Sequence, residues 1–272
     1  MSDKKLLCTD VDGTLLSEDG NVTEENRRAL SQALEAGHKV AIVTGRSITG
    51  ARPVIEKSGL DQNGVYLLAY QGSQIYDYGK KKLIWQDGMP GETAGELLLA
   101  LQEEGIYGHT FSDQGILTLR TGKELELYCR QTPESYQVIT DVSELKGMVV
   151  PKVMAIDFET DENLRQFQKK FKAKEKGRLN SFFSDTCYLE YCKKGCHKGN
   201  GLKRLVSILQ WDLSNVIAVG DERNDIPMIE NAGIGVAMCN GRTEVKAIAD
   251  YITESDCDHS GVAEVIDRFV LN

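Results

Sequence analysis

The 272-residue sequence has no uninterrupted apolar run of the 18 or so residues that a membrane-spanning helix needs; its apolar stretches are short, such as Val216–Val219. The first five residues, Met1 to Lys5, lead into only two leucines, which is too little for the hydrophobic segment of a secretory signal. We therefore expect a cytoplasmic protein without a membrane segment.

Positive charge is also scarce, since 32 Lys and Arg stand against 41 Asp and Glu, a formal net charge of −9. Nucleic-acid binders draw much of their affinity from Lys and Arg that neutralise phosphates, so this balance argues against a nucleic-acid partner. It does not exclude a small anionic ligand, because a bound metal ion can reverse the field inside a pocket.

Proline is rare as well, with five in the chain, and we see no proline-rich linker, internal repeat or low-complexity segment. The seven cysteines are an odd number at scattered positions, which favours reduced thiols in a chain of this length. Cys187, Cys192 and Cys196 precede His197, but their spacing fits no structural zinc pattern. We expect ordinary reduced cysteines here.

The first 85 residues alternate strand and helix signals. Leu6–Thr9 is a short apolar run, Thr23 can cap a following helix with an apolar stripe, and Lys39–Val43 is the next strand. Such alternation is typical of a parallel sheet with helices packed on it. The same pattern returns near the end of the chain with the apolar run Asn215–Val219.

The middle of the chain has a different texture, in which alternating apolar runs mix with helix-like segments. We therefore predict an α/β fold with a discontinuous, Rossmann-like parallel-sheet core, residues 1–86 and 189–272. An inserted α+β cap, residues 87–188, would interrupt this core. The length then corresponds to one core split by one cap, not to two consecutive domains.

Asp10 and Asp12 directly follow the first predicted strand. Residues two apart on an extended backbone point to the same side, so both carboxylates can reach one site, and Gly13 lets the chain turn away. Taken alone, such a pair more often marks a solvated turn. Its place at the carboxyl end of a buried strand favours a ligand site.

Two further segments suit an anionic ligand. Thr44 and Gly45 follow the second strand, where a hydroxyl and free main-chain N–H groups can bind an anionic oxygen. Lys198 precedes an apolar helical stripe, and a lysine at a helix start opposes the helix dipole unless an anion lies there. The ordinary alternatives are a helix cap for Thr44 and an exposed lysine for Lys198.

Asp221 and Asp225 follow the strand Asn215–Val219 and can face one site if a helix begins between them. Together with Asp10 and Asp12 they would place four carboxyl groups at one sheet edge, where these groups repel one another unless a cation bridges them. Mg²⁺ is the natural choice, since it takes carboxylate oxygens, keeps several waters and accepts a phosphate oxygen. The joint pattern is far more specific than its parts.

In this order and context, the motifs resemble those of the haloacid dehalogenase superfamily of phosphohydrolases. The resemblance rests on Asp10-x-Asp12-Gly13-Thr14-Leu15, the Thr44 segment, Lys198-Gly199 and Gly220-Asp221-x-x-Asn224-Asp225. The Cof-type, sugar-phosphatase-like branch is the nearer match, on Leu189-Glu190, Pro227-Met228-Ile229, Gly235-Val236-Ala237-Met238-x-Asn240, and Thr253 followed by Gly261-Val262-Ala263. The resemblance covers nearly all of the core, whereas the middle segment matches only in length and position.

One segment departs from the family pattern: Gln71-Gly72-Ser73 stands where the family usually has Asn-Gly-Ala. We expect the longer amide to alter pocket shape or hydrogen bonding to the substrate. This puts the substrate range in question and leaves catalysis unaffected.

The resemblance implies a Mg²⁺-dependent phosphatase that hydrolyses small phosphomonoesters, such as sugar phosphates, through an aspartyl-phosphate intermediate. Asp10 would be the nucleophile, and Asp12 the general acid and base. It also implies Mg²⁺ ligation by Asp10, the Asp12 main-chain carbonyl and Asp221, with Asp225 in support. Phosphate binding would come from Val11, Thr44, Gly45, Lys198 and Asn224. The cap would close over the site and select the leaving group.

The residues leave other functions open. A phosphomutase of the same superfamily would return the phosphoryl group to a sugar instead of releasing phosphate. A signalling module would keep a phosphoryl group on Asp10, although Asp12 and an insertion of roughly a hundred residues argue against it. A catalytically silent α/β binding protein is the plainest alternative. The expected partner is a small phosphorylated metabolite, and the sequence predicts no oligomeric state.

Overall fold

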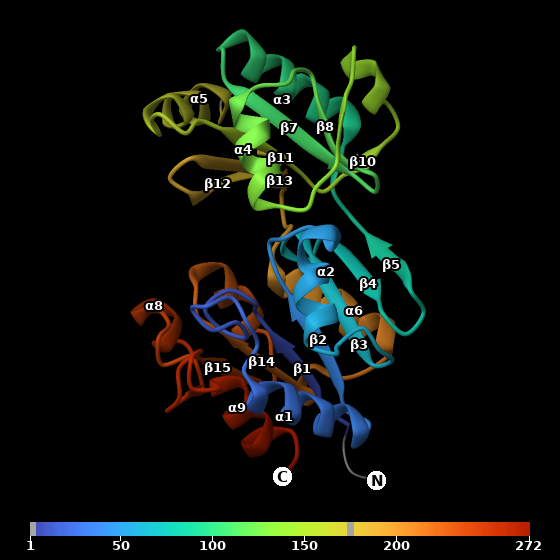
Figure 1. The fold of residues 1–272 in the computed structure, drawn as a ribbon, viewed down its shortest axis with the longest axis vertical. Helices are drawn as coiled ribbons and strands as arrows, with labels where there is room; N and C mark the ends of the chain where they lie inside the picture. The colour runs from blue at the N-terminus through green and yellow to red at the C-terminus, as the bar shows by residue number, and fades with distance from the viewer. Residues whose placement is uncertain (1–3, 173–176) are drawn as a thin grey trace. The chain divides into compact units, whose positions relative to one another are not determined.

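The computed structural model describes residues 4–172 and 177–272, so residues 1–3 of the N-terminal segment considered above lie outside it. The chain divides into two compact units. One comprises the chain up to Trp85 together with His197–Asn272, and the other is Gln86–Cys196 (Figure 1). Within the described ranges, no helix is both long and apolar enough to span a membrane.

The first unit is built on a parallel-rich sheet, which confirms the predicted α/β class. In the described residues this sheet has eight strands in the order β16-β15-β14-β1-β2-β3-β4-β5. Neighbours from β16 to β3 run parallel, and β4 runs antiparallel to β3. The strands are β1 Leu6–Thr9, β2 Lys39–Val43, β3 Val65–Ala69, β4 Gln74–Asp77, β5 Lys82–Gln86, β14 Val216–Gly220, β15 Ile234–Ala237 and β16 Tyr251–Ile252.

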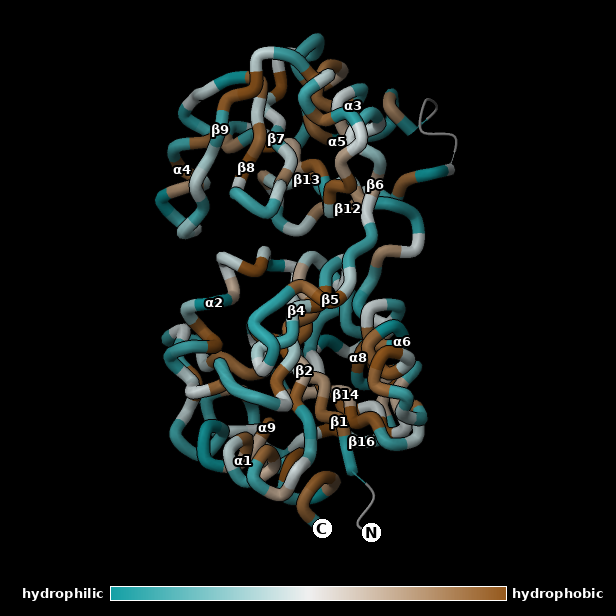
Figure 2. Tube along the Cα trace, turned by 90° about the vertical axis from the view of Figure 1, so that its right-hand side faces the viewer, coloured by the Kyte–Doolittle hydropathy of each residue, from teal (hydrophilic) through white to brown (hydrophobic). Residues whose placement is uncertain are grey.

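The central strands are buried on both faces, which explains their nearly continuous apolar sequences. Every residue of β1 and of β14 is buried, and Figure 2 colours the region around these strands as hydrophobic. On one face, Leu202 and Leu205 pack against Leu6 and Cys8 of β1. The helices of this unit are α1 Glu24–Glu35, α2 Ile48–Lys57, α6 Lys198–Leu209, α7 Ile226–Ile229, α8 Thr243–Lys246 and α9 Gly261–Phe269.

The carboxyl ends of three neighbouring parallel strands create the edge where polar residues gather. Strands β14, β1 and β2 lie side by side and run in the same direction, so their ends open on one edge of the sheet. Asp10 follows β1, Thr44 follows β2 and Asp221 follows β14. The topology therefore brings together residues from distant parts of the chain.

The second unit has a sheet and a hydrophobic core of its own. In the described residues this sheet has six strands in the order β12-β13-β11-β7-β8-β9, and β6 pairs separately with β10. Leu97 and Leu101 of α3 share one core with Leu164 and Phe167 of α5. The elements are β6 Met89–Pro90, α3 Gly91–Glu103, β7 Tyr107–Ser112, β8 Gly115–Thr118, α4 Lys123–Gln131, β9 Tyr136–Val138, β10 Val149–Val150, β11 Lys152–Ile156, α5 Glu162–Lys172, β12 Leu179–Asp185 and β13 Tyr188–Lys193.

Strand β13 belongs to a different unit from the one that the sequence-based division gave it. We expected the core to resume at residue 189, but β13 pairs antiparallel with β11 and β12 of the second unit. The second unit accordingly extends to Cys196. The sequence of β13 is compatible with either sheet, because only the identity of the neighbouring strands distinguishes the two.

Helices α1 and α9 lie side by side (Figure 1), and one buried side chain links them. Thr23 caps α1 as predicted, since its side chain accepts the Asn26 N–H. Ser260 at the start of α9 makes no such side-chain cap. Instead Asn26 of α1, which is fully buried, accepts the N–H of Ala263 at 2.8 Å. One helix thus supplies the cap of another.

We predict that Asn26→Ala lowers the free energy of unfolding by about 0.5–1.5 kcal/mol, because it removes a buried hydrogen bond and leaves the Ala263 N–H with the Ser260 carbonyl as its acceptor at 2.9 Å. Urea unfolding followed by circular dichroism measures the change. Arg28→Ala, at an exposed position of the same helix, is the control and should change stability by less than about 0.5 kcal/mol. Equal stabilities of the two variants would contradict the proposed capping role of Asn26.

Candidate active site

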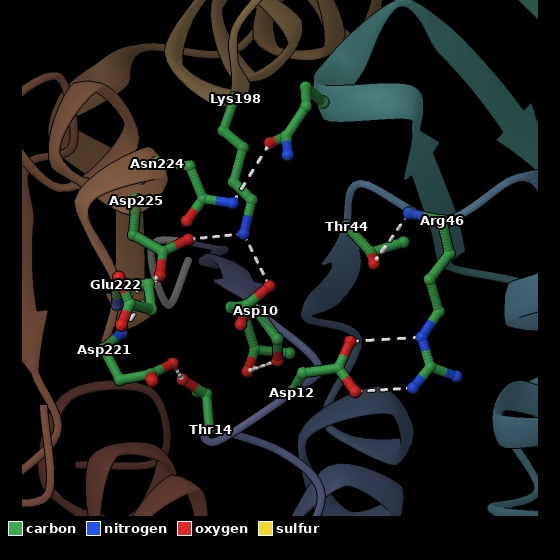
Figure 3. A network of polar contacts seen from close by, with 12 residues as sticks. Asp10, Asp12, Thr14, Thr44, Arg46, Lys198, Asp221, Glu222, Asn224 and Asp225 are labelled. Atoms are coloured by element: carbon green, nitrogen blue, oxygen red, sulfur yellow. Dashed lines mark hydrogen bonds and ion pairs between the residues drawn. The ribbon is translucent and has the colours of Figure 1, made fainter. Parts of the chain in front are cut away.

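Asp10, Lys198 and Asp225 form a buried, charged contact at the carboxyl edge of the sheet (Figure 3). The Lys198 ammonium group donates to Asp10 Oδ1 and to Asp225 Oδ1, each at 2.5 Å. Asp10 is 6% exposed, Lys198 1% and Asp225 0%. The main-chain N–H of Asp10 donates to the Val219 carbonyl of β14 at 3.0 Å, so pairing with β14 fixes the position of the Asp10 backbone.

Lys198 is the first residue of α6, where a positive charge opposes the helix dipole. Two carboxylates offset that charge. Burial by itself lowers the pKa of Lys198, but the adjacent carboxylates of Asp10 and Asp225 outweigh burial and raise it. Lys198 is therefore a buried, charged lysine, and the structure excludes the exposed surface lysine that we considered from the sequence.

The turn after β14 holds Asp221 and Asp225. Asp225 Oδ2 accepts the N–H groups of Asp221 and Glu222, each at 3.0 Å, which closes the turn. A side chain at Gly220 would not fit, because its Cβ would lie 2.4 Å from the Asp225 carboxyl carbon. Asp225 thus uses one oxygen to shape the turn and the other to contact Lys198.

Asp221 completes a cluster of three carboxyl groups. Its Oδ1 accepts the Thr14 hydroxyl at 2.7 Å, and oxygens of Asp10, Asp221 and Asp225 all lie within 4.8 Å of one another. Gly13 approaches so closely that a Cβ there would lie 2.6 Å from Asp221 Oδ2. The structure therefore brings together three of the four acidic side chains that we singled out.

The cluster is short of positive charge. Burial, together with the nearby Asp225 carboxylate, raises the pKa of Asp10 to about 8, against the opposing pull of Lys198. Burial and Asp225 also raise the pKa of Asp221 to about 6, against the hydrogen bond from Thr14. Three carboxyl groups that share one ammonium suit a divalent cation that prefers oxygen ligands, because the cation would favour the ionised form of each carboxyl group.

Asp12 lies apart from this cluster and pairs with Arg46 (Figure 3). Arg46 Nε donates to Asp12 Oδ2 at 3.1 Å and Arg46 Nη2 donates to Asp12 Oδ1 at 2.5 Å. The two residues thus form a bidentate ion pair. The Asp12 side chain is 58% exposed. We assigned Arg46 no role from the sequence, although its place directly after Thr44-Gly45, at a strand end, was the available signal.

Thr44 follows β2 and is 1% exposed. Its hydroxyl oxygen accepts the N–H of Arg46 at 3.2 Å, which leaves the hydroxyl proton available for an acceptor in the site. Gln71 lies beside this loop, because its N–H donates to the Thr44 carbonyl at 2.9 Å. The sequence flagged Gln71 only as a departure from the family pattern.

The two remaining candidates differ in exposure. Val11 is buried, and its carbonyl accepts the N–H groups of Leu15 and Leu16, so its own N–H is the group that suits a ligand. Asn224 is exposed in the turn after β14, and its Nδ2 donates to Gln71 Oε1 at 3.4 Å. Gln71 therefore connects the turn after β14 with the loop after β2.

Comparisons with known proteins agree at the levels of sequence and structure. A family model described as haloacid dehalogenase-like hydrolase matches residues 7–266. Pyridoxal phosphate phosphatase YbhA of Escherichia coli is 31% identical over 258 residues, 91% of this chain and 92% of that protein. Phosphatase YwpJ of Bacillus subtilis is 30% identical over 285 residues, 96% of this chain and 98% of that protein.

A solved structure extends the similarity to the fold. The crystal structure of a haloacid dehalogenase-like hydrolase from Bacteroides thetaiotaomicron has a TM-score of 0.88 at 27% identity. It covers 97% of this chain and 99% of that chain. The similarity thus includes both units and is not confined to the motifs of the site.

The raised pKa of Asp10 predicts a pH-dependent stability in buffer that contains a chelator. A buried acid whose pKa is about 8 keeps its proton in the folded state, while the unfolded chain releases it above the ordinary aspartate pKa of 3.8. The free energy of unfolding therefore falls as the pH rises from about 4 to 8. Asp10→Asn removes this penalty and should stabilise the protein at pH 7.5 more than at pH 4.

The gain should shrink as the pH falls toward 4, which urea unfolding at several pH values measures. Asp61→Asn, at an exposed position of the same unit, is the control and should show no such trend. An Asp10→Asn protein less stable than the wild type at pH 7.5 would mean that the Lys198 ion pair outweighs burial.

Proposed function

The chain belongs to the haloacid dehalogenase-like hydrolases, and we propose that it is a Mg²⁺-dependent phosphatase of small phosphomonoesters. The proposal draws on two relatives of this chain that are named phosphatases. Hydrolysis would proceed through an aspartyl-phosphate intermediate on Asp10. The observation that carries the proposal is the buried Asp10 carboxyl held by Lys198 inside a cluster of three carboxylates.

Asp10, Asp221 and Asp225, with the main-chain carbonyl of Asp12, are the groups proposed to hold Mg²⁺. When ionised, the three carboxyl groups offer only acceptor oxygens, and a single ammonium contacts them among the described residues, so a divalent cation would compensate the remaining negative charge. When bound, the ion reduces the repulsion between the anionic nucleophile and the phosphate.

Asp10 is the proposed nucleophile. One carboxylate oxygen forms a bond to phosphorus while the bond between phosphorus and the ester oxygen breaks, and water then hydrolyses the acyl phosphate. Lys198 contacts Asp10 Oδ1 at 2.5 Å, so it keeps the carboxylate oriented and lies where negative charge grows on the phosphoryl oxygens. Both side chains are buried, which strengthens this interaction.

Asp12 is the proposed general acid and base. It would protonate the leaving oxygen in the first step and accept a proton from the attacking water in the second. Its side chain is half-exposed, so it can exchange protons with solvent between the two steps. Arg46 holds the resting carboxylate in one orientation through its two hydrogen bonds.

The phosphoryl oxygens would be bound by donors from three strand ends and from the start of α6. These donors are the Thr44 hydroxyl, the N–H groups of Val11 and Gly45, the Lys198 ammonium and the Asn224 amide. Most of the barrier reduction in phosphoryl transfer comes from such positioning and charge stabilisation. In this proposal, the second unit acts as the cap that selects the leaving group, and the protein works in the cytoplasm.

We predict that Asp10→Asn abolishes Mg²⁺-dependent phosphate release and leaves the fold intact, because a neutral amide is a poor nucleophile. The assay measures free phosphate from a panel of sugar phosphates, nucleotides and pyridoxal phosphate, with Mg²⁺ and with a chelator. Pyridoxal phosphate is included because a relative is named for its hydrolysis.

The same assay separates the alternatives. Transfer of the phosphoryl group to sugar without free phosphate would indicate a mutase, and a long-lived phosphoprotein without turnover would indicate a signalling module. An Asp10→Asn enzyme with nearly wild-type turnover would exclude Asp10 as the nucleophile.

We further predict that Lys198→Met lowers kcat/KM by about 10²–10³-fold, the loss typical of one missing oxyanion donor. Lys203→Met, at an exposed position of the same helix, is the matched control and should keep wild-type kinetics. Steady-state phosphate release on the best substrate of the panel measures both variants. Unchanged kinetics in Lys198→Met would remove the lysine from the mechanism.

A further inference from the structure

The turn between β3 and β4 has an unusual backbone. Tyr70, Gln71 and Gly72 have φ values of +49°, +59° and +86°, three consecutive residues in the left-handed region. This conformation costs an ordinary L-residue about 1–2 kcal/mol, and asparagine tolerates it better than glutamine does. The sequence nevertheless places the longer amide at position 71. Strain of this kind persists where the surrounding structure holds it in place, often at functional sites.

The loop after β2 and the start of α6 hold this turn. Two of its N–H groups donate to the loop after β2. The Tyr70 N–H donates to the Arg46 carbonyl and the Gln71 N–H donates to the Thr44 carbonyl, each at 2.9 Å. On the other side, a Cβ at Gly72 would lie 2.8 Å from the Cα of Gly201, in the first turn of α6. The turn is therefore fixed between the loop that carries Thr44 and the helix that begins with Lys198.

The Gln71 side chain extends from this fixed turn toward the phosphate-binding candidates. Its Nε2 lies over Gly45, where a Cβ would approach within 2.7 Å, and its Oε1 accepts the Asn224 amide at 3.4 Å. An asparagine at position 71 is one methylene shorter, and it would lose this already long hydrogen bond. Glutamine is thus the amide whose length suits the contact.

The orientation of Asn224 matters because its amide has two unlike ends. The NH₂ group can donate to an anionic phosphoryl oxygen, whereas the carbonyl oxygen would repel it. A carbonyl partner that accepts one hydrogen of Nδ2 fixes the NH₂ end and leaves the second hydrogen for a ligand. Asn224 is exposed and lies in a short turn, so its orientation depends on such a partner.

We propose that Gln71 is a positioning residue whose side-chain carbonyl orients the Asn224 amide toward the phosphoryl group. The proposal rests on the proposed phosphatase function for the identity of the ligand, a phosphoryl oxygen. Gln71 acts through Asn224 and does not itself contact the phosphoryl group. The requirement is for a carbonyl at this reach, and filling the space over Gly45 is not sufficient.

Two substitutions separate these features. Gln71→Asn keeps the amide and shortens its reach, and Gln71→Met keeps the length and removes the carbonyl. Each should lower kcat/KM for p-nitrophenyl phosphate with Mg²⁺ by about three- to tenfold, the range of one neutral hydrogen bond. Gln71→Asn should keep or slightly raise the thermal midpoint, because asparagine suits the left-handed backbone. Gln62→Asn, at an exposed position of the same unit, is the control.

A double-mutant cycle with Asn224→Ala tests the dependence on Asn224. If Gln71 acts through Asn224, adding Gln71→Asn to Asn224→Ala should lower kcat/KM by less than about twofold further. Multiplying losses would overturn the proposal, since Gln71 would then act independently. Wild-type kinetics in Gln71→Met would also overturn it, because the side chain would then only fill space.

Calorimetric titration with inorganic phosphate and Mg²⁺ provides a readout that does not require turnover. Gln71→Asn should weaken phosphate binding by about three- to tenfold, with no further loss in the Asn224→Ala background. If the wild type releases no phosphate from any ester, the proposed function fails, while this titration still decides the role of Gln71. Unchanged phosphate affinity in Gln71→Asn would reject that role.

Discussion

The site depends on one interaction, the buried contact of the Lys198 ammonium with the carboxylates of Asp10 and Asp225. Transferring these charges from water to a protein interior is costly, and the contact is tolerated only because the partners lie within 2.5 Å. Three elements must meet for this to happen: the end of β1, the turn after β14 and the start of α6. The parallel sheet places the first two side by side, and the packing of α6 on the same sheet brings the third.

The distribution of charge explains how an acidic protein can hold an anionic ligand. The chain has a net charge of −9, and its candidate site adds carboxylates that only one contacting ammonium offsets among the described residues. A divalent cation in this cluster would change the local sign, and the surrounding N–H and hydroxyl donors would then face a phosphate. Global charge thus excludes a polyanionic partner more firmly than it excludes a small phosphorylated one.

In the first unit, a strained stretch of backbone lies in a turn beside the site and not in the central strands. Strands β1 and β3 are buried along their whole length, while consecutive left-handed residues occur at Tyr70, Gln71 and Gly72 beside the site. Hydrogen bonds to the Thr44 loop and close backbone packing on α6 keep the turn in this conformation. A rigid scaffold can therefore hold polar side chains in a fixed geometry before a ligand arrives.

The sequence by itself determined the α/β class, the cap of α1 at Thr23 and the polar residues at the strand ends, because these features depend on neighbours within a few positions. Tertiary structure alone decided which side chains meet. Arg46 pairs with Asp12 across 34 positions, Gln71 with Asn224 across 153, and Asn26 caps a helix 237 residues away. Strand β13 joins the sheet of the second unit for the same reason. Such contacts follow from strand register and helix packing, which no local pattern encodes.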